Sequence, residues 1–310
     1  MTKTSINKTK LQPNPVRIEF EVTNHCNAKC EFCPRYNIKK YGMMDFNKYK
    51  KFILNFKEIK NDLWINKLKK IKTDYPIIVF GGYGESLLHP KIFKFIKFAK
   101  INKYKTELIT NGLLLTEENC KKIYNAGLDK LCISLHTLDP KINKRVTSLK
   151  NVIPVITKAL KYFDDKKINI EIWRVSKSNG EEYDKNESTD AYNFFLSPYK
   201  KNIVVLGPTP AWNRGGQLKS KYYPIAKDPG GIIRCQIMFF TLSISFNGDF
   251  VLCCCDFSTK NKLLAKEWNF NFSKVQNQII KLQKKVPAMC LKCRRPKINY
   301  LKKLLNNSYL

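Results

Sequence analysis

Short apolar runs alternate with longer amphipathic stretches through the first two-thirds of the chain. The runs predict six strands: Val16–Val22, Ile77–Phe80, Thr106–Thr110, Lys130–Leu135, Ile168–Val175 and Ile203–Leu206. The longer stretches repeat their apolar residues at helical spacing. They predict four helices: Phe46–Phe56, Pro90–Ile101, Thr116–Ala126 and Val152–Phe163.

Strands that alternate with helices indicate βαβ units and a parallel sheet. Six such units predict an α/β fold built on a partial (β/α)6 TIM-like barrel. In barrels of this kind the chemistry lies at the carboxyl ends of the strands.

The pattern changes after Leu206, where glycine and proline become frequent. Farther on, Thr241–Phe246 and Phe250–Cys254 flank Asn247-Gly248, a pair typical of a tight hairpin turn. A helical stretch near Val275–Lys285 follows. We therefore divide the chain into an N-terminal tail (1–15), a core domain (16–206), a linker (207–231), a small cysteine-rich C-terminal domain (232–300) and a C-terminal tail (301–310).

Composition narrows the setting in which such a protein works. No run approaches the roughly 18 apolar residues of a membrane span, and Met1–Lys10 lacks a secretory signal, so we expect a cytoplasmic protein without a membrane partner. The chain has 11 cysteines, an odd number. In a reducing compartment, clustered cysteines indicate bound metal rather than a disulfide framework.

The chain is strongly basic, with 57 Lys+Arg against 25 Asp+Glu and a net charge of +32. Such a charge could attract nucleic acid. The lysines are scattered among Asn and Ile residues along the whole chain, which argues against one nucleic-acid-binding surface. RNA modification is therefore kept only as an alternative function.

The first cysteine cluster follows the first predicted strand directly. Cys26, Cys30 and Cys33 have the spacing C-x3-C-x2-C. Three thiolates on one loop can bind three corners of a cubane iron–sulfur cluster and leave one iron open for chemistry. A zinc site with a distant fourth ligand, or buried unreactive thiols, are the alternatives.

This triplet at the end of the first strand resembles the signature of the radical S-adenosylmethionine (SAM) superfamily. The resemblance implies that Cys26, Cys30 and Cys33 bind a catalytic [4Fe-4S] cluster whose open iron is chelated by SAM. Reductive cleavage of SAM would give a 5′-deoxyadenosyl radical that abstracts hydrogen from a substrate. Phe32 matches the aromatic residue that packs near the adenine.

A second match is the segment Gly81-Gly82-Tyr83-Gly84-Glu85, which follows the second predicted strand. It resembles the family's G-G-E motif, which binds the methionyl ammonium of SAM. Glycines allow close approach of the backbone, and carbonyls together with Glu85 offer acceptors for a cation. The chain departs from the commoner G-G-E-P by the insertion of Tyr83-Gly84 and by Ser86 in place of proline.

Three further positions resemble family sites near the SAM ribose or carboxylate: Asn111, Ser134 and Arg145. An arginine could pair with the carboxylate as a bidentate fork. The same residues could equally have ordinary turn or surface roles. We assign structural roles to His25, His89 and His136.

The second cysteine cluster resembles the C-terminal SPASM or twitch extension of radical SAM enzymes. Its predicted ligands are Cys235, Cys253, Cys290 and Cys293. This set is complete for one auxiliary [4Fe-4S] cluster, although a zinc ribbon would use the same four thiolates. Either Cys254 or Cys255 could replace Cys253. Cys120 and Cys132 are predicted to be core residues.

The resemblance implies an oxidoreductase or maturase that acts on a sugar-like small molecule or a peptide. A closed auxiliary cluster would accept an electron from the substrate radical, and a donor such as flavodoxin or ferredoxin would reduce the catalytic cluster. The absence of a separate N-terminal peptide-recognition domain favours the small molecule. The alternatives are an RNA-modifying radical SAM enzyme and a non-catalytic iron–sulfur or zinc-binding module.

Overall fold

The protein was analysed as a computed structural model, which describes residues 15–62, 76–177, 183, 189–199, 203–210, 217–218, 240–257, 262–264, 277–278, 281, 288–291 and 293. Within these residues nine strands form one sheet in the order β6-β5-β4-β3-β2-β1-β7-β8-β9. They are β1 (Arg17–Phe20), β2 (Ile77–Phe80), β3 (Thr106–Thr110), β4 (Lys130–Ser134), β5 (Asn169–Ser176), β6 (Ile203–Pro210), β7 (Thr241–Ile244), β8 (Phe250–Val251) and β9 (Lys262–Leu264). Strands β1 to β7 are parallel to their neighbours, and β8 and β9 are antiparallel additions.

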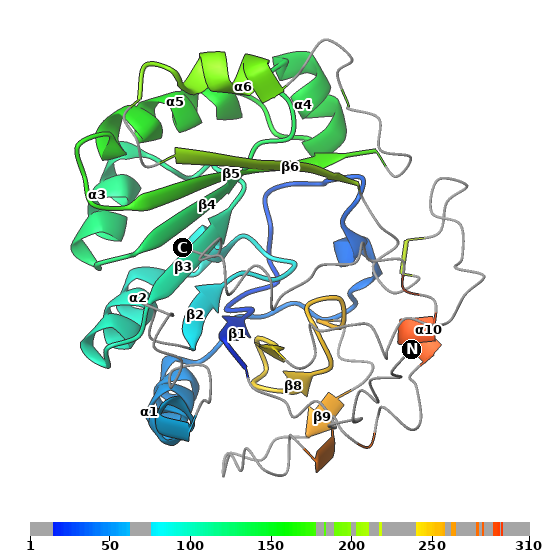
Figure 1. The fold of residues 1–310 in the computed structure, drawn as a ribbon. Coiled ribbons are helices and arrows are strands. Elements are labelled where there is room, and N and C mark those ends of the chain that lie inside the picture. Colours follow the sequence, from blue (N-terminus) through cyan, green and yellow to red (C-terminus); the bar gives the residue numbers. More distant parts are fainter. Residues whose placement is uncertain are drawn as a thin grey trace, which may run out of the picture.

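The helices follow the strands along the outer side of this curved sheet (Figure 1). They are α1 (Phe46–Asp62), α2 (Ile92–Ile101), α3 (Glu117–Asn125), α4 (Pro140–Thr147), α5 (Val152–Phe163) and α6 (Thr189–Leu196), with the short α10 (Ala288–Leu291) near the end of the chain. Two 3-10 helices, η1 (Pro34–Asn37) and η3 (Ser86–Leu88), lie in loops. The predicted partial α/β barrel is confirmed.

Helix α4 had not been predicted. Its sequence carries only two large apolar residues, Ile142 and Val146, so its helical period is weak. Its start is nevertheless encoded locally. The Asp139 side chain accepts hydrogen bonds from the backbone N–H groups of Lys141 and Ile142, and Pro140 occupies the first helical turn.

The two faces of the sheet differ in chemistry because side chains alternate along each strand. Phe20 of β1 points outward, where its ring lies 5.0 Å from that of Tyr49 and 6.0 Å from that of Phe52 on α1. Arg17 and Glu19, on the opposite face of the same strand, point into the concave interior. Apolar packing against helices therefore holds the outer face, and polar groups line the inner face.

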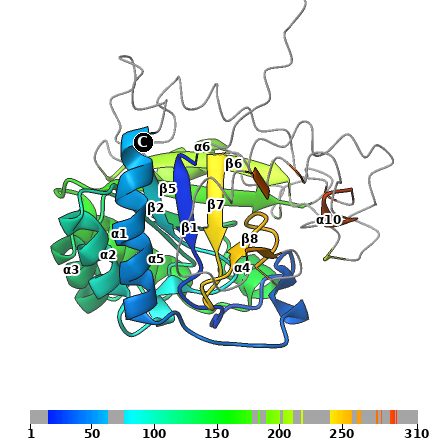
Figure 2. The same cartoon turned by 90° about the horizontal axis from the view of Figure 1, so that it is seen from below.

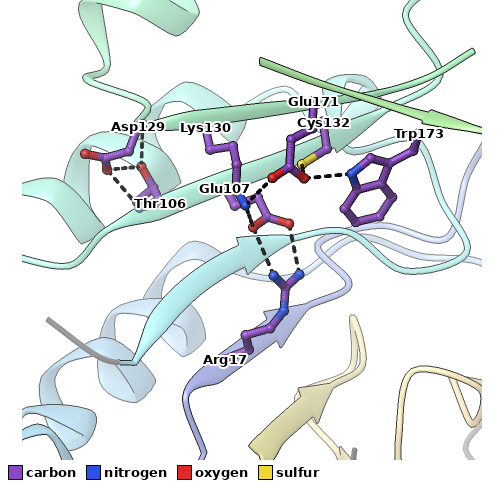
Figure 3. A network of polar contacts seen from close by, with 8 residues as sticks. All are labelled: Arg17, Thr106, Glu107, Asp129, Lys130, Cys132, Glu171 and Trp173. Carbon is purple, nitrogen blue, oxygen red and sulfur yellow. Dashed lines mark hydrogen bonds and ion pairs between the residues drawn. The ribbon is translucent and has the colours of Figure 1, made fainter. Parts of the chain in front are cut away.

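A network of buried charges crosses the amino ends of the strands on the inner face (Figure 3). The Glu107 carboxylate accepts two hydrogen bonds from the Arg17 guanidinium at 3.0 and 2.9 Å. The Lys130 ammonium lies 3.3 Å from Glu107 and 3.0 Å from Glu171. Trp173 Nε1 donates to Glu171 at 2.8 Å. Burial alone would raise the pKa of Glu107, but Arg17 and Lys130 lower it to about 2.

The predicted hairpin forms and joins the barrel sheet. Strand β7 lies beside β1 in parallel register, with Glu19 opposite Ser243, and Figure 2 shows the two strands next to each other. Gly248 in the turn has φ of +88°, as an Asn-Gly turn requires. Strand β8 ends at Val251, before the predicted limit at Cys254.

Residues 207–210, placed in the linker by the sequence, belong to β6 instead. Thr209 and Pro210 pair with Val175 and Ser176 of β5 beyond a register shift. Within the described sheet β6 is an edge strand, and an edge strand tolerates proline because its outer N–H groups need no partner. The predicted helix Val275–Lys285 falls almost entirely outside the described residues.

No helix in the described part of the chain combines the length and apolar character needed to cross a membrane.

Candidate metal and cofactor site

The loop that leaves the carboxyl end of β1 carries Cys26, Cys30 and Cys33, all half-buried. Cys33 N–H donates to the Cys30 carbonyl at 3.1 Å, which closes a tight turn. Burial raises the pKa of the Cys26 thiol to about 11, and burial together with Cys33 and Cys26 raises that of Cys30 further. The three thiols are therefore close enough to influence one another.

Helix α4 anchors this loop from outside the motif. Lys29 N–H donates to the carbonyl of Thr147 at 2.8 Å, and Glu31 N–H donates to that of Val146 at 3.0 Å. Thus the carbonyls at the carboxyl end of α4, which lack helical partners, find them in the cysteine loop. Sequence reasoning missed this contact because the two segments are more than a hundred residues apart.

Arg35 is a second feature that the sequence reading missed. Its Nη2 donates to the Ala28 carbonyl at 2.9 Å, inside the cysteine loop. Its positive charge lowers the pKa values of Cys26 and Cys30, against the larger effect of burial. The only hint of this contact in the sequence is that a basic residue stands two positions after the third cysteine.

The donor set fits an iron–sulfur cluster. Thiolates are soft ligands, and three on one loop suit a cluster with an open iron. Among the described residues no three His, Cys, Asp or Glu side chains are gathered as ligands of a single metal ion would be.

The glycine-rich segment after β2 packs directly against the end of β1. A Cβ atom on Gly84 would lie only 2.0 Å from the Thr23 carbonyl oxygen, and one on Gly82 would lie 2.8 Å from Glu21 Cβ. Gly82 also has φ of +127°, which side-chain-bearing residues rarely adopt. Glu85 N–H donates to the His25 carbonyl at 2.8 Å, so this segment is tied to the residue that precedes Cys26.

The Glu85 carboxylate turns inward and binds the next loop. It accepts hydrogen bonds from Thr110 Oγ1 at 2.9 Å, Asn111 N–H at 2.7 Å and Leu87 N–H at 3.1 Å. Burial raises the pKa of Glu85, and these donors partly offset the rise. The side chain thus links β2 to β3, which leaves the backbone carbonyls of the glycine segment as the better acceptors for an ammonium group.

Asn111 connects the third strand to the cysteine loop. Its Nδ2 donates to Asn27 Oδ1 at 2.7 Å and lies 3.9 Å from Cys26 Sγ. The structure therefore brings together the ends of β1, β2 and β3 around Cys26, as the order of motifs predicts.

The other predicted positions lie around β4 and α4. Phe32 is buried, and the centroid of its ring lies 4.8 Å from that of His136, with the two rings nearly perpendicular. Ser134 is half-buried at the carboxyl end of β4, and Arg145 is exposed on α4. Phe32 lies in the cysteine loop itself, between Cys30 and Cys33, whereas Ser134 and Arg145 have no hydrogen bond to that loop in the part of the chain that the structure describes.

Tyr83 and Glu21 were not singled out by the sequence. Tyr83, the residue inserted in the glycine segment, is buried and donates its N–H to Glu21 Oε1 at 3.1 Å. Glu21 lies just beyond β1, and its Oε2 has no hydrogen-bond partner in the described structure. Burial raises the pKa of Glu21 well above its ordinary value.

Three of the four predicted auxiliary ligands fall in the described residues, and Cys235 lies outside them. Cys253 and Cys290 pack against the same hydrophobic core, and Cys293 N–H donates to the Cys290 carbonyl at 3.2 Å. A hydrogen bond with the Cys255 side chain lowers the pKa of Cys253, but burial and the neighbouring Cys254 and Cys290 raise it above its ordinary value. Cys253 and Cys290 are therefore near neighbours.

The three consecutive cysteines have different surroundings. Cys253 is hydrogen-bonded to Cys255 and interacts electrostatically with Cys254 and Cys290, whereas Cys254 packs against the group formed by Tyr83, Val251 and Phe257. Cys255 is buried, and its N–H donates to Cys253 Sγ at 3.4 Å. These contacts favour Cys253 as the ligand that shares a site with Cys290.

The remaining cysteines and histidines have local partners. Cys120 and Cys132 are fully buried, as predicted for core residues. His89 Nε2 lies 3.0 Å from the Met44 carbonyl, and the Val175 N–H donates to His136 Nδ1 at 3.2 Å. These contacts agree with the structural roles expected for both histidines.

Known proteins resemble this chain in sequence over its first half. Residues 20–182 match the family model of the radical SAM superfamily. The chain is 30% identical over 139 residues to the tungsten-containing aldehyde ferredoxin oxidoreductase cofactor-modifying protein of Pyrococcus furiosus, a match that covers 44% of this chain and 35% of that protein. It is 33% identical over 139 residues to a probable GTP 3′,8-cyclase of Methanococcus aeolicus, covering 42% of this chain and 40% of the relative. The matches thus span well under half the length of these relatives.

Two solved structures share the fold over nearly the whole chain. BtrN in complex with AdoMet and 2-DOIA superposes with a TM-score of 0.55 at 17% identity, covering 92% of this chain and 98% of BtrN. SuiB of Streptococcus suis bound to S-adenosylmethionine gives a TM-score of 0.55 at 15% identity, covering 89% of this chain and 67% of SuiB. The family match covers more than half of the 310 residues, and it includes the glycine segment and the cysteine loop with Cys26, Cys30 and Cys33. The chain belongs to the radical SAM superfamily.

Proposed function

We propose that the protein is a radical SAM enzyme that abstracts hydrogen from a sugar-like small molecule or a peptide and completes its oxidation or maturation. The observation that carries the proposal is the joining of three motifs. The cysteine loop, the glycine segment and Asn111 are hydrogen-bonded to one another at the carboxyl ends of β1, β2 and β3. In barrels of this type that end holds the chemistry.

In this proposal Cys26, Cys30 and Cys33 hold a [4Fe-4S] cluster. When bound, the cluster supplies the electron that cleaves SAM to a 5′-deoxyadenosyl radical. The fixed backbone at Gly82–Gly84 presents carbonyls to the methionyl ammonium, and Glu85 holds that backbone in place through β3. Phe32 would pack near the adenine, while Ser134 and Arg145 would contact the ribose or carboxylate.

We further propose that Cys235, Cys253, Cys290 and Cys293 hold an auxiliary [4Fe-4S] cluster that accepts an electron from the substrate radical. The electrostatic interaction of Cys290 with Cys253 supports this set. The fold match to BtrN, which extends over 98% of that chain, also supports it. A donor such as flavodoxin or ferredoxin would reduce the first cluster.

The proposed substrate class rests only on the similarity of this chain to proteins of known structure. One neighbour is a complex with 2-DOIA, and SuiB has been solved with its precursor peptide SuiA. These names leave both a small molecule and a peptide open for this chain. RNA modification has only the net charge in its favour.

The test is anaerobic purification and reconstitution, followed by incubation with SAM and dithionite. We expect about eight irons and eight sulfides per chain, on two cubanes, and release of 5′-deoxyadenosine. Cys120→Ala, which alters a buried cysteine of α3, serves as the control and should retain both. About four irons with bound zinc would overturn the auxiliary cluster. Absence of 5′-deoxyadenosine from chains with full iron content would overturn the radical chemistry.

A further inference from the structure

Tyr83 joins the glycine segment to the turn after β8 that carries Cys253 and Cys255. Its backbone N–H is fixed by Glu21, as described above. Its ring is buried beside Val251 and lies 5.7 Å from Phe257, edge to face. The residue that distinguishes this glycine segment from the common motif thus packs against the end of β8 and the turn after it. In the sequence it lies 172 residues before Cys255.

The Tyr83 hydroxyl makes the polar part of this contact. It donates to the Cys255 carbonyl at 2.7 Å. Gln217 Nε2 donates to the Tyr83 hydroxyl at 3.1 Å and also contacts the Cys255 carbonyl. Cys255 is therefore held by two side chains from distant parts of the sequence.

Cys255 in turn contacts the predicted ligand Cys253. Its N–H points to Cys253 Sγ at 3.4 Å. Hydrogen bonds to the sulfur ligands are one of the means by which a protein sets the reduction potential of an iron–sulfur cluster. A donor at the sulfur offsets negative charge, so it favours the reduced form and makes the potential less negative.

We propose that Tyr83 is a positioning residue for the auxiliary cluster: by holding the Cys255 backbone, it keeps the Cys255 N–H on the sulfur of Cys253 and thereby raises the cluster's reduction potential. The inference rests on the proposed function, because it requires Cys253 to be a ligand. It also gives a role to the residue that interrupts the G-G-E motif.

The experiment is a redox titration of the reconstituted full chain followed by EPR, with wild type compared with Tyr83→Phe. This change keeps the ring and removes the hydroxyl. We expect unchanged iron content and a shift of the auxiliary cluster's midpoint potential to more negative values. Gln217→Leu, which removes the other donor to Cys255, should shift it in the same direction.

Tyr49→Phe is the matched control. Tyr49 is also a buried tyrosine, and its hydroxyl donates to a backbone carbonyl, that of Phe95, at 3.0 Å, on the outer face of the sheet. It should leave the potential unchanged.

The outcomes separate this inference from the proposal beneath it. About eight irons with no shift in both Tyr83→Phe and Gln217→Leu would overturn the role of Tyr83 and leave the two-cluster enzyme intact. An equal shift in Tyr49→Phe would also overturn it, by showing a general effect of lost packing. About four irons in the wild type would refute the auxiliary cluster itself, and the inference with it.

Discussion

Buried charged residues are paired with one another at the amino ends of the barrel strands, whereas toward the carboxyl ends a buried carboxyl group is only partly satisfied. At the amino ends, Arg17 and Lys130 face Glu107 and Glu171 in close ion pairs (Figure 3). Toward the carboxyl ends, Glu21 is fully buried with an unpartnered Oε2 in the described structure. The same sheet therefore holds a matched set of charges at one end and an incompletely matched set at the other.

Strand β7, which pairs with β1, repeats this contrast. Ser243 lies opposite Glu19 on the inner face, and Ser245 follows two residues later. Both hydroxyls are buried and lack partners among the described residues. A buried polar group without a partner costs about 1–3 kcal/mol. Such a cost is expected where a ligand is to be bound, since local rules are broken mainly at functional sites.

The largest expected effect comes from the carboxyl end. Cys30→Ala removes one proposed ligand of the first cluster, so we expect 5′-deoxyadenosine release to fall to background and about four irons per chain to be lost. Iron analysis and product chromatography check this. Retained cleavage at full iron content would show that Cys30 is not a ligand.

The amino end should respond in stability rather than in chemistry. Arg17→Met leaves Glu107 with Lys130 alone, and breaking a buried ion pair costs about 3–5 kcal/mol. Urea unfolding should show this loss, while the folded fraction should still cleave SAM. The double variant Arg17→Met/Glu107→Gln should recover part of the stability, because it removes the uncompensated charge. A double variant as unstable as the single one would contradict the account.

Local sequence patterns were enough for most of the sheet. Strands β2 and β3 and helix α5 have the predicted bounds, because the apolar pattern that defines each of them is contained within the segment. Helices α4 and α6 were not predicted, because each is only eight residues long and therefore too short to show a clear repeat of apolar positions.

The parts of the site that belong to recognisable sequence motifs could be predicted. Cys26, the glycine segment and Asn111 each follow a predicted strand, and the resemblance implied that all three lie near SAM. The contacts that complete the site were not predictable in this way. The docking of the cysteine loop on α4 and the bond from Tyr83 to Cys255 join residues far apart in sequence, and no local pattern encodes them.

A smaller effect is expected from the close approach of the glycine segment to β1. The Cβ in Gly84→Ala would meet the backbone of Thr23, so we expect a loss of about 1–3 kcal/mol in stability and weaker SAM binding. Gly81→Ala is the matched control. Its Cβ would lie 2.8 Å from the movable end of the Ile109 side chain, which can shift. Urea unfolding measures the change in stability, and the EPR change on SAM addition measures SAM binding. Equal losses in both variants would contradict the argument.

The smallest expected effect is a pH dependence of the free energy of unfolding, which comes from Glu107 at the amino ends of the strands. The pKa of Glu107 is about 2 in the folded chain, below the ordinary glutamate value of 4.5 that applies in the unfolded chain, so the unfolded chain takes up this proton first as the pH falls. The stabilisation is complete above about pH 4.5 and is lost as the pH approaches 2. Between pH 5 and 3.5 the loss from this group is about 1 kcal/mol. Urea unfolding across that range should show a steeper decline for the wild type than for Glu107→Gln, which lacks the titrating carboxyl. Parallel declines would mean that Glu107 is not held ionised by Arg17 and Lys130, and the contrast between the matched and unmatched ends would then lose its energetic basis.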